Sequence, residues 1–412
     1  MKALLIKACA PSPFKDYKKY MGSPSQNIFS TAACTPSYVE LEMVDETSGM
    51  KVDFRSDADI VAIFFSTPDA IRAYEIADKF RKKGKAIILG GLHATFMKDE
   101  AKEHADAVII GESEGIWEQI LKDAENNSLK PFYERTEALD LKGLNHYPKH
   151  IIDASKYNWV WSVLVSRGCK YKCAFCLVHE FSGKIRHRPV KDVVDEIRRA
   201  PSNWIELHSD SLFADKEYAR ELLTAIKPLK IEWSTEADLT IAEDEELLDL
   251  AAESGLNYML AGIETPSKEA LKKVGKGFLD VSKTNQYIKR LKDRGIDVES
   301  NILFGFDEHT TDIFEDSWEY IKDLELSNCF PTIVIPFPGS RTYAKLEREN
   351  RILTRDWSLY DGANVVFEPK NMSVRELEEG SQWVWEQYEG RKYGTSMWAK
   401  GKSLISYMLG YN

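Results

Sequence analysis

Three cysteines are spaced closely enough to hold a metal centre. Cys169, Cys173 and Cys176 form the pattern CxxxCxxC directly after the apolar run Trp161–Val165. Cysteine thiolates are the usual ligands of iron–sulfur clusters, and a four-iron cluster normally takes four of them. Three cysteines therefore leave one iron open to a small molecule.

Two other interpretations fit parts of this pattern. Cys176 and His179 are spaced as Cys-x-x-His, so the histidine could complete a Cys3His zinc site. A disulfide is the weaker alternative, because six cysteines in 412 residues are sparse and these three are too close together to staple much of the chain. Spacing alone leaves the zinc alternative open.

The CxxxCxxC pattern resembles the signature of the radical S-adenosylmethionine (SAM) enzymes. In that family the amine and carboxylate of SAM chelate the fourth iron. The resemblance thus implies a [4Fe-4S] cluster held by Cys169, Cys173 and Cys176, with SAM as a cofactor. It also implies that Phe175 lies near the SAM adenine, because the family carries an aromatic residue there.

Length and composition limit the class of protein. A chain of 412 residues suggests two or three domains, and 43% hydrophobic residues suffice for sizeable cores. The net charge of −11 disfavours a nucleic-acid partner. No run of 18 apolar residues predicts a membrane span, and the first residues lack a signal-peptide pattern. We expect a cytoplasmic protein in which Cys9, Cys34 and Cys329 stay reduced.

The first third of the chain predicts a parallel sheet covered on both faces. Short apolar runs occur at Leu4–Lys7, Val39–Val44, Ile60–Ser66, Ala86–Leu89 and Ala107–Ile110, with a helical pattern over Ala70–Lys83. Ligands of such sheets bind beyond the carboxyl ends of the strands, here at residues 66–69, 90–95 and 111–115. No GxGxxG is present, so a nicotinamide or flavin site is poorly supported.

Residues 55–125 resemble the cobalamin-binding domain that precedes many radical SAM barrels. The resemblance implies that the loops hold the corrin and its nucleotide tail through Ser66, Thr67, Gly90, Gly91, His93, Gly111, Glu112 and Glu114. The alternative for Gly90–Gly91 is a tight strand-to-helix turn. The stretch Pro11–Pro36 departs from the family and is expected to be loop-like.

No histidine fits the Asp-x-His-x-x-Gly motif through which many cobalamin domains coordinate cobalt. We therefore expect the loop 66–70 to face the lower side of the metal without an imidazole, and His93 to lie near the nucleotide tail.

The middle of the chain predicts a parallel α/β barrel, because strand and helix patterns alternate. The expected strands are Trp161–Val165, Trp204–His208, Ile231–Ser234, Tyr258–Ile263, Val298–Phe304 and Thr332–Ile335. The expected helices are Val190–Arg199, Lys216–Ile226, Glu243–Glu253, Ser282–Arg294 and Asp312–Leu324. Six strands match the partial (β/α)6 barrel of radical SAM enzymes, with chemistry at the carboxyl ends.

Polar residues follow these strands. By resemblance, Ser209 and Asp210 take the place of the segment that binds the SAM amino group. Glu236 and Glu264 would face the SAM ribose or its methionyl part, which suits carboxylates because they are pure acceptors. For each of them a solvated loop acid is the alternative.

Three further segments, 186–197, 261–266 and 336–343, resemble the cobalamin-type members, so the resemblance covers residues 55–385. The expected fold is an α/β chain with a Rossmann-like cobalamin-binding domain at 1–135, a linker at 136–158, a radical SAM partial barrel at 159–345 and a mostly helical C-terminal cap at 346–412.

The resemblance implies a cobalamin-dependent radical SAM C-methyltransferase acting on an unactivated sp3 carbon. A reduced cluster would generate the 5′-deoxyadenosyl radical, and methylcobalamin would supply the methyl group. An external flavodoxin or ferredoxin would donate electrons. Chain length and the compact tail are similar to the glutamine C-methyltransferase of methyl-coenzyme M reductase, a post-translational modification enzyme.

Three alternatives stay open. The substrate could be a small molecule or lipid precursor instead of a protein or peptide. The enzyme could use both cofactors without moving a methyl group. The chain could also be a cobalamin carrier with a structural zinc site.

Overall fold

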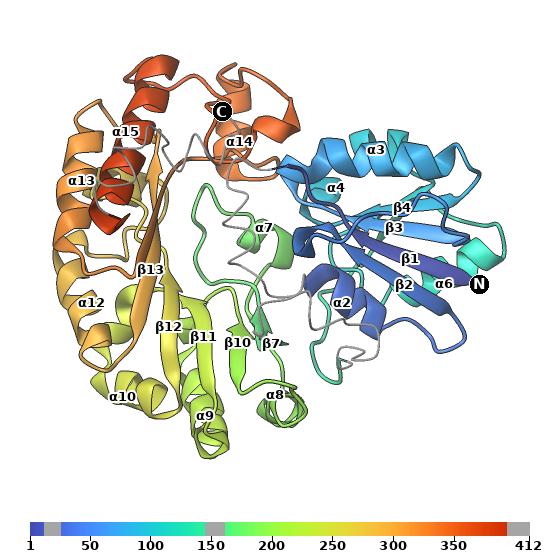
Figure 1. Ribbon diagram of the computed structural model, residues 1–412, viewed down its shortest axis with the longest axis horizontal. Coiled ribbons are helices and arrows are strands. Elements are labelled where there is room, and N and C mark those ends of the chain that lie inside the picture. Colours follow the sequence, from blue (N-terminus) through green and yellow to red (C-terminus); the bar gives the residue numbers. More distant parts are fainter. Residues whose placement is uncertain (12–25, 145–160, 394–412) are drawn as a thin grey trace. The chain divides into compact units, whose positions relative to one another are not determined.

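The structure is a computed structural model that describes residues 1–11, 26–144 and 161–393 (Figure 1). The described residues form two compact units. The first unit contains the chain up to residue 162 together with residues 181–183 and 356–358. The second unit contains residues 163–180, 184–355 and the chain from 359 onward.

The first unit is built on a six-stranded parallel sheet in the order β2-β1-β3-β4-β5-β6. Its strands are β1 (Lys2–Lys7), β2 (Glu40–Asp45), β3 (Ile60–Phe64), β4 (Ala86–Gly90), β5 (Ala107–Ile110) and β6 (Phe132–Glu134). Every residue of β3 is buried, as expected of a central strand covered on both faces. The chain order reverses between β1 and β3, which makes their carboxyl ends the topological switch point where such sheets bind ligands.

The helices of this region are α2 (Gln26–Ala33), α3 (Ala70–Arg81), α4 (Leu92–Phe96), α5 (Lys98–Glu103) and α6 (Trp117–Glu125). Helices α2 and α3 cover opposite faces of the sheet (Figure 1). Helix α2 corrects the expectation of a loop over Pro11–Pro36 for residues 26–33; residues 12–25 lie outside the described part. The Ser and Thr residues of α2 weaken its helical hydrophobic pattern in the sequence, but Ile28, Phe29 and Ala32 form a buried face.

The chain from residue 161 onward forms a second parallel sheet in the order β14-β13-β12-β11-β10-β7. Its strands are β7 (Trp161–Leu164), β10 (Trp204–His208), β11 (Glu232–Ala237), β12 (Leu256–Ala261), β13 (Asp297–Phe304) and β14 (Asn328–Ile333). Neighbours in the sheet are neighbours in sequence, which is the topology of a partial (β/α)6 barrel and confirms the expected fold class.

The helices of this region are α7 (Val178–Ser182), α8 (Val190–Ile197), α9 (Lys216–Ile226), α10 (Glu245–Glu253), α11 (Lys268–Lys273), α12 (Thr284–Lys292), α13 (Ile313–Asp323), α14 (Arg341–Arg348) and α15 (Val374–Tyr393). Helices α9, α10, α12 and α13 lie along the outside of the curved sheet (Figure 1). A two-stranded antiparallel pair, β8 (Ser166–Arg167) with β9 (Arg186–His187), brackets the cysteine loop.

Some expected elements differ in detail. The last strand begins at Asn328 and ends at Ile333, before the end predicted at Ile335. The linker expected at 136–158 lies outside the described residues from 145 onward. In the expected cap, helix α15 carries the helical character, residues 394–412 lie outside the described part, and residues 349–373 are mostly irregular with a bridge between Ile352 and Phe367. Within the described ranges, no helix has the length and apolarity that crossing a membrane would need.

Candidate functional site

The cysteine loop lies between β8 and α7 and is anchored by backbone hydrogen bonds. The Ala174 N–H donates to the Val274 carbonyl (2.8 Å), and the Ala174 carbonyl accepts from the Thr342 N–H (2.9 Å). The Phe175 ring packs against Phe306, with ring centroids 5.9 Å apart. These contacts fix the loop from both sides, so the three cysteines are held on a supported backbone.

The three thiols are half-buried and close enough to interact electrostatically. Burial raises the pKa of Cys169 and Cys173, and it raises the pKa of Cys176 to about 11. A thiol in such a place becomes a thiolate when a metal supplies the opposing charge. Each cysteine of a four-iron cluster binds a different iron, so the three sulfurs need only surround the cluster. The three thiols lie on one loop and interact with one another electrostatically, as ligands of one cluster would.

The zinc alternative gains no support from the geometry. His179 Nδ1 contacts the carbonyl oxygen of Cys169 at 3.3 Å. In the described part of the chain, no three His, Cys, Asp or Glu side chains gather closely enough for a single metal ion.

Asp210 and Ser209 follow β10 and both reach the cysteine loop region. The Asp210 carboxylate accepts a hydrogen bond from the Gly168 N–H at 2.6 Å, directly before Cys169. The Ser209 hydroxyl is buried and hydrogen-bonded to that of Ser166 at 2.7 Å. Ser209 thereby ties β10 to β8, while Asp210 shapes the entrance of the loop.

Glu264 follows β12 and forms a buried ion pair with Lys276 at 2.5 Å. The pair also interacts electrostatically with the cysteine loop, because the positive charge of Lys276 lowers the pKa of Cys173 and partly offsets the effect of burial. Burial alone would lower the pKa of Lys276, but Glu264 raises it above the usual range. A Cβ on Gly262 would displace both charged groups from their present positions.

The Glu264 backbone is strained, with a φ of 69° in the left-handed region that non-glycine residues rarely adopt. It is held there by β13, since its N–H donates to the Asn301 carbonyl (3.1 Å) and its carbonyl accepts from the Leu303 N–H (2.6 Å). Such strain is often found at functional sites. Lys276 was not predicted from the sequence, because its partner is twelve positions away and no short motif links them.

The inner face of the second sheet is polar. On β10, Ile205 and Leu207 are fully buried, whereas the alternating Glu206 and His208 are only half-buried. Glu236 on β11 belongs to the same face, and its side chain is exposed. Its pKa is nevertheless raised, mainly because nearby protein atoms displace water around the carboxylate. The charge of His208 lowers this pKa, and the charge of Glu206 raises it further. The inner face is therefore a hydrogen-bonding surface and not a packed apolar core.

In the first unit, the loops after β3, β4 and β5 meet at one edge of the sheet. The Phe65 N–H donates to the Gly90 carbonyl (3.2 Å), and the Gly111 N–H donates to the Thr95 hydroxyl (3.0 Å). Gly91 has a φ of 102°, and a Cβ there would lie 2.6 Å from the Phe65 carbonyl oxygen. Gly90 and Gly91 therefore form a tight turn, and the same turn brings the loop after β4 against the loop after β3.

The remaining predicted residues of this edge are found on the same loops. His93 Nδ1 lies 3.2 Å from the Thr67 hydroxyl, which links the loops after β3 and β4. Glu114 and its neighbour Ser113 are buried, and the Ser113 hydroxyl contacts that of Thr31 on α2 at 2.6 Å. Ser66 hydrogen-bonds to Asp69 at 2.6 Å, whereas Glu112 is half-buried on the loop after β5.

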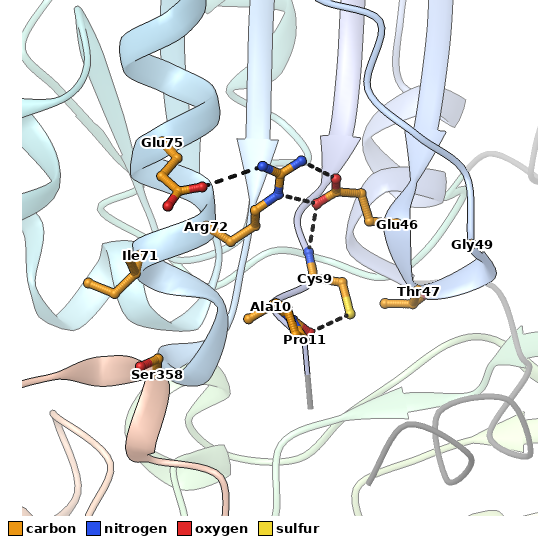
Figure 2. A pocket seen from close by; sticks show the side chains of 10 residues that line it. All are labelled: Cys9, Ala10, Pro11, Glu46, Thr47, Gly49, Ile71, Arg72, Glu75 and Ser358. Atoms are coloured by element: carbon orange, nitrogen blue, oxygen red, sulfur yellow. Dashed lines mark hydrogen bonds and ion pairs between the residues drawn. The ribbon is translucent and has the colours of Figure 1, made fainter. Parts of the chain in front are cut away.

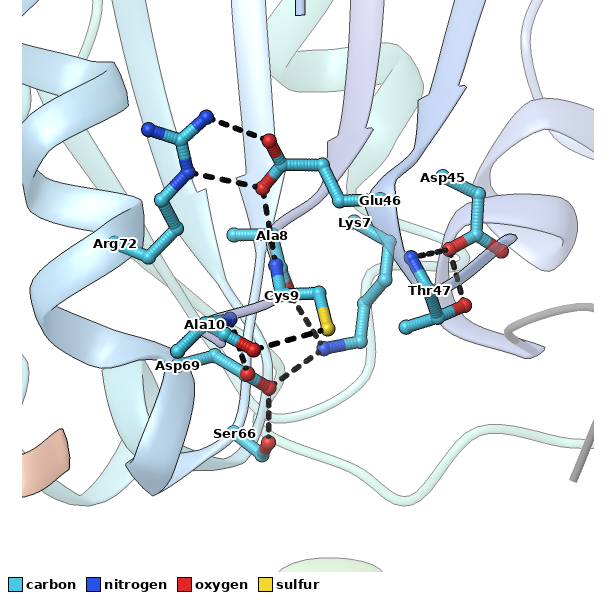
Figure 3. Close-up of polar contacts among 10 residues, drawn as sticks. All are labelled: Lys7, Ala8, Cys9, Ala10, Asp45, Glu46, Thr47, Ser66, Asp69 and Arg72. Atoms are coloured by element: carbon cyan, nitrogen blue, oxygen red, sulfur yellow. Dashed lines mark hydrogen bonds and ion pairs between the residues drawn. The ribbon is translucent and has the colours of Figure 1, made fainter. Parts of the chain in front are cut away.

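Asp69 is a residue of this edge that sequence reasoning did not single out. Its buried carboxylate accepts hydrogen bonds from Lys7 Nζ (3.0 Å), the Ala10 N–H (2.9 Å) and Ser66 (2.6 Å), as Figure 3 shows. It therefore joins the ends of β1 and β3, the two strands of the switch point. Its signal in the sequence would have been an acid directly after a buried strand in a sheet with this order.

A cavity of about 650 Å³ opens beside the ends of β1 and β2 (Figure 2). One wall carries the Arg72–Glu46 pair, whose closest atoms are 2.6 Å apart. The Glu46 carboxylate also accepts from the Cys9 N–H at 3.1 Å, so the wall is fixed to the end of β1. The other lining residues are Ala10, Pro11, Thr47, Gly49, Ile71, Glu75 and Ser358.

Comparison with known proteins finds relatives whose similarity extends over both units. Residues 163–321 match the family model for the radical SAM superfamily. The chain is 30% identical over 354 residues to the bacteriochlorophyllide d C-8(2)-methyltransferase of Chlorobaculum tepidum, covering 81% of this chain and 78% of that protein. It is 27% identical to the C-12(1)-methyltransferase of the same organism, covering 86% of this chain and 80% of that protein.

Two solved structures share the fold. The radical SAM methyltransferase TsrM of Kitasatospora setae matches with a TM-score of 0.69 and 16% identity, over 84% of this chain and 76% of TsrM. The cobalamin-dependent SAM radical enzyme OxsB matches with a TM-score of 0.70 and 16% identity, over 94% of this chain and 67% of OxsB. The sequence match to the C-8(2)-methyltransferase goes beyond the fold, and with it the chain belongs to the family of radical SAM methyltransferases.

Proposed function

We propose that this enzyme is a cobalamin-dependent C-methyltransferase that acts on an unactivated sp3 carbon of a small molecule. The observation that carries the proposal is the CxxxCxxC loop at the carboxyl end of the first strand of a six-stranded parallel barrel sheet. When bound, the cluster and SAM supply a 5′-deoxyadenosyl radical and cobalamin supplies the methyl group.

Residues of the second unit would hold the cluster and SAM. Cys169, Cys173 and Cys176 would ligate three irons. Asp210 and Glu264 would accept hydrogen bonds from SAM, each already oriented by a partner: the Gly168 N–H for Asp210 and Lys276 for Glu264. Preorganised acceptors of this kind position a ligand without reorganising when it binds. Phe175 and Glu236 would border the same ligand.

Residues of the first unit would hold cobalamin. The sheet order favours a ligand outside the carboxyl ends of β1 and β3, where Ser66 and Thr67 lie, with Gly91 at the end of the neighbouring β4. Corrin side chains are amides and need both donors and acceptors, which the Arg72–Glu46 wall of the cavity offers. The OxsB structure and a second TsrM structure have cobalamin bound, which supports this assignment.

The relatives favour a small-molecule substrate. The bacteriochlorophyllide methyltransferases and the hopanoid C-2 methylase of Rhodopseudomonas palustris are named for small-molecule or lipid substrates. A protein glutamine, the target suggested by chain length, has no counterpart among these relatives. The polar inner face with Glu206 and His208 further suits a substrate that forms hydrogen bonds.

Counting the products of SAM tests this function. The anaerobically reconstituted protein, supplied with cobalamin, SAM, a strong reductant and a small-molecule extract of the cells that produce it, should form both 5′-deoxyadenosine and S-adenosylhomocysteine. The first product reports radical formation and the second reports methyl transfer. Formation of 5′-deoxyadenosine without S-adenosylhomocysteine would show an enzyme that moves no methyl group and would overturn the proposal.

Asp210→Ala should weaken SAM binding roughly tenfold to more than a hundredfold, because a charge-assisted hydrogen bond is worth about 1.5–3 kcal/mol. Asp210→Asn is the matched variant, since it keeps an acceptor for the Gly168 N–H but loses the charge. If the charge binds SAM, both variants lose affinity, measured by isothermal titration, while both retain iron. Unchanged SAM affinity in Asp210→Asn would leave Asp210 with a loop-shaping role alone.

Bound Co(II) cobalamin should lack a nitrogen ligand from the protein. Both ring nitrogens of His93 have partners, Thr67 at 3.2 Å and Glu100 at 3.4 Å, and the ring is fully buried. The electron paramagnetic resonance spectrum should therefore show no protein-derived nitrogen superhyperfine splitting. Splitting that disappears in His93→Ala would identify His93 as an axial ligand and refute this placement.

A further inference from the structure

A short segment near the C-terminus belongs to the first unit. Residues 356–358 group with the sheet of β1–β6, although the residues before and after them belong to the second unit. Trp357 is the centre of the segment and is only 2% exposed. A buried indole combines a large apolar surface with one N–H that needs a hydrogen-bond partner.

The indole N–H of Trp357 donates to the Glu100 carboxylate at 2.8 Å. The same oxygen of Glu100 accepts from the Tyr74 hydroxyl at 2.9 Å and faces His93 Nε2 at 3.4 Å. The Trp357 ring also meets the His93 ring edge to face, with centroids 4.9 Å apart. Glu100 is thus a hub that joins α3, α4, α5 and the segment 356–358.

The network continues to the loop after β3. A carboxylate only accepts hydrogen bonds, so His93 Nε2 must carry the proton that faces Glu100. In the neutral ring, His93 Nδ1 then accepts from the Thr67 hydroxyl, which lies 3.2 Å away. Trp357 and Glu100 therefore determine the tautomer and the orientation of the ring that holds Thr67, a residue at the switch point of the sheet.

We infer that Trp357 is a positioning residue for the cofactor loops: through Glu100 and His93 it fixes Thr67, and without it the first unit binds cobalamin less tightly. The inference rests on the proposed function, because it concerns the cobalamin that this unit would hold. It adds that the cofactor site requires residues more than 200 positions beyond its own sheet, since Trp357 and Glu100 are 257 positions apart.

The test uses the full-length protein and three variants, Trp357→Phe, Glu100→Gln and the double variant. Trp357→Phe keeps a ring but removes the N–H, and it should weaken cobalamin binding several-fold in an absorbance titration. Glu100→Gln should weaken binding more, because it alters the acceptor of three groups. The double variant should bind about as weakly as Glu100→Gln alone, because both changes act through one network.

A second measurement reports the network itself. The 15N-histidine spectrum of the apoprotein should show an Nε2-protonated His93 whose Nε2 signal shifts in Trp357→Phe, with the signal assigned by His93→Gln. Trp204→Phe is the matched control, because that indole is 46% exposed and its loss should change neither binding nor the His93 signal. Iron content confirms that the second unit stays intact in each variant.

The outcomes separate the two claims. Cobalamin affinity in Trp357→Phe equal to that of the unaltered protein would overturn the positioning role while leaving the proposed function in place. Additive losses in the double variant would also overturn it, because they would mean independent effects. An unaltered protein that binds no cobalamin would instead refute the proposed function, and an unshifted His93 signal would then refute the network as well.

Discussion

The variant with Cys169, Cys173 and Cys176 replaced by alanine should lose essentially all of its roughly four irons per chain and all SAM cleavage. The three thiols lie on one supported loop, and each would bind a separate iron. Cobalamin binding should be retained, because its proposed residues lie in the other compact unit. Iron and cobalamin are measured in the same reconstituted sample, by colorimetric assay and by absorbance.

Two control variants sharpen this experiment. Cys34→Ala removes a cysteine from the first unit and should leave the iron content unchanged. His179→Ala removes the fourth ligand of the zinc alternative and should also retain full iron. Stoichiometric iron in the triple variant would contradict the assignment of the cluster, whereas iron loss in His179→Ala would revive a site with a histidine ligand.

Lys276→Met should destabilise the second unit by about 3–5 kcal/mol, the usual cost of removing one partner from a buried ion pair. Lys276 and Glu264 are both more than 90% buried, so the change leaves the Glu264 carboxylate without its counter-charge. The pKa of Lys276 is raised by Glu264, so its charge stabilises the folded state throughout the neutral range, and this contribution is lost only as the solution becomes strongly alkaline. Urea unfolding, followed by circular dichroism, measures it.

The matched control is Lys273→Met, since Lys273 is an exposed lysine three positions earlier and should cost little. The double variant Lys276→Met with Glu264→Leu should recover part of the lost stability, because it leaves no unpaired buried charge. If Lys276→Met unfolds at the same urea concentration as Lys273→Met, the buried pair does not stabilise the unit. SAM binding in the double variant should still be impaired, because Glu264 is absent.

The elements with strong local patterns could be predicted from the sequence. Strand Trp204–His208 and helix Lys216–Ile226 have the predicted bounds, because one is a short strand between turns and the other has a clear apolar stripe. The CxxxCxxC loop was also identifiable, because its three cysteines lie within eight residues of one another. Elements whose hydrophobic pattern is interrupted by polar residues or proline were missed or predicted with other bounds. Pro331 disfavours a strand, but β14 lies at the sheet edge, where proline is tolerated.

Contacts between distant parts of the chain could not be predicted. Asp69 joins β1 to β3 across 62 positions, and Trp357 reaches Glu100 across 257. Neither residue belongs to a motif, and each acquires its role only when folding brings its partner close. The sequence therefore predicts which loops end at the carboxyl edges of the sheets, while the residues that hold those loops in place emerged from the packing.

Mass spectrometry with methyl-deuterated SAM tests the central claim most directly. The reconstituted enzyme is incubated anaerobically with this SAM, a reductant and a small-molecule extract of the cells that produce it. The account predicts a product in which one CD3 group replaces one carbon-bound hydrogen, formed together with 5′-deoxyadenosine and absent from the triple cysteine variant. A CD3 group found only on nitrogen or oxygen, or SAM cleavage without any labelled product in an extract that contains the substrate, would contradict it.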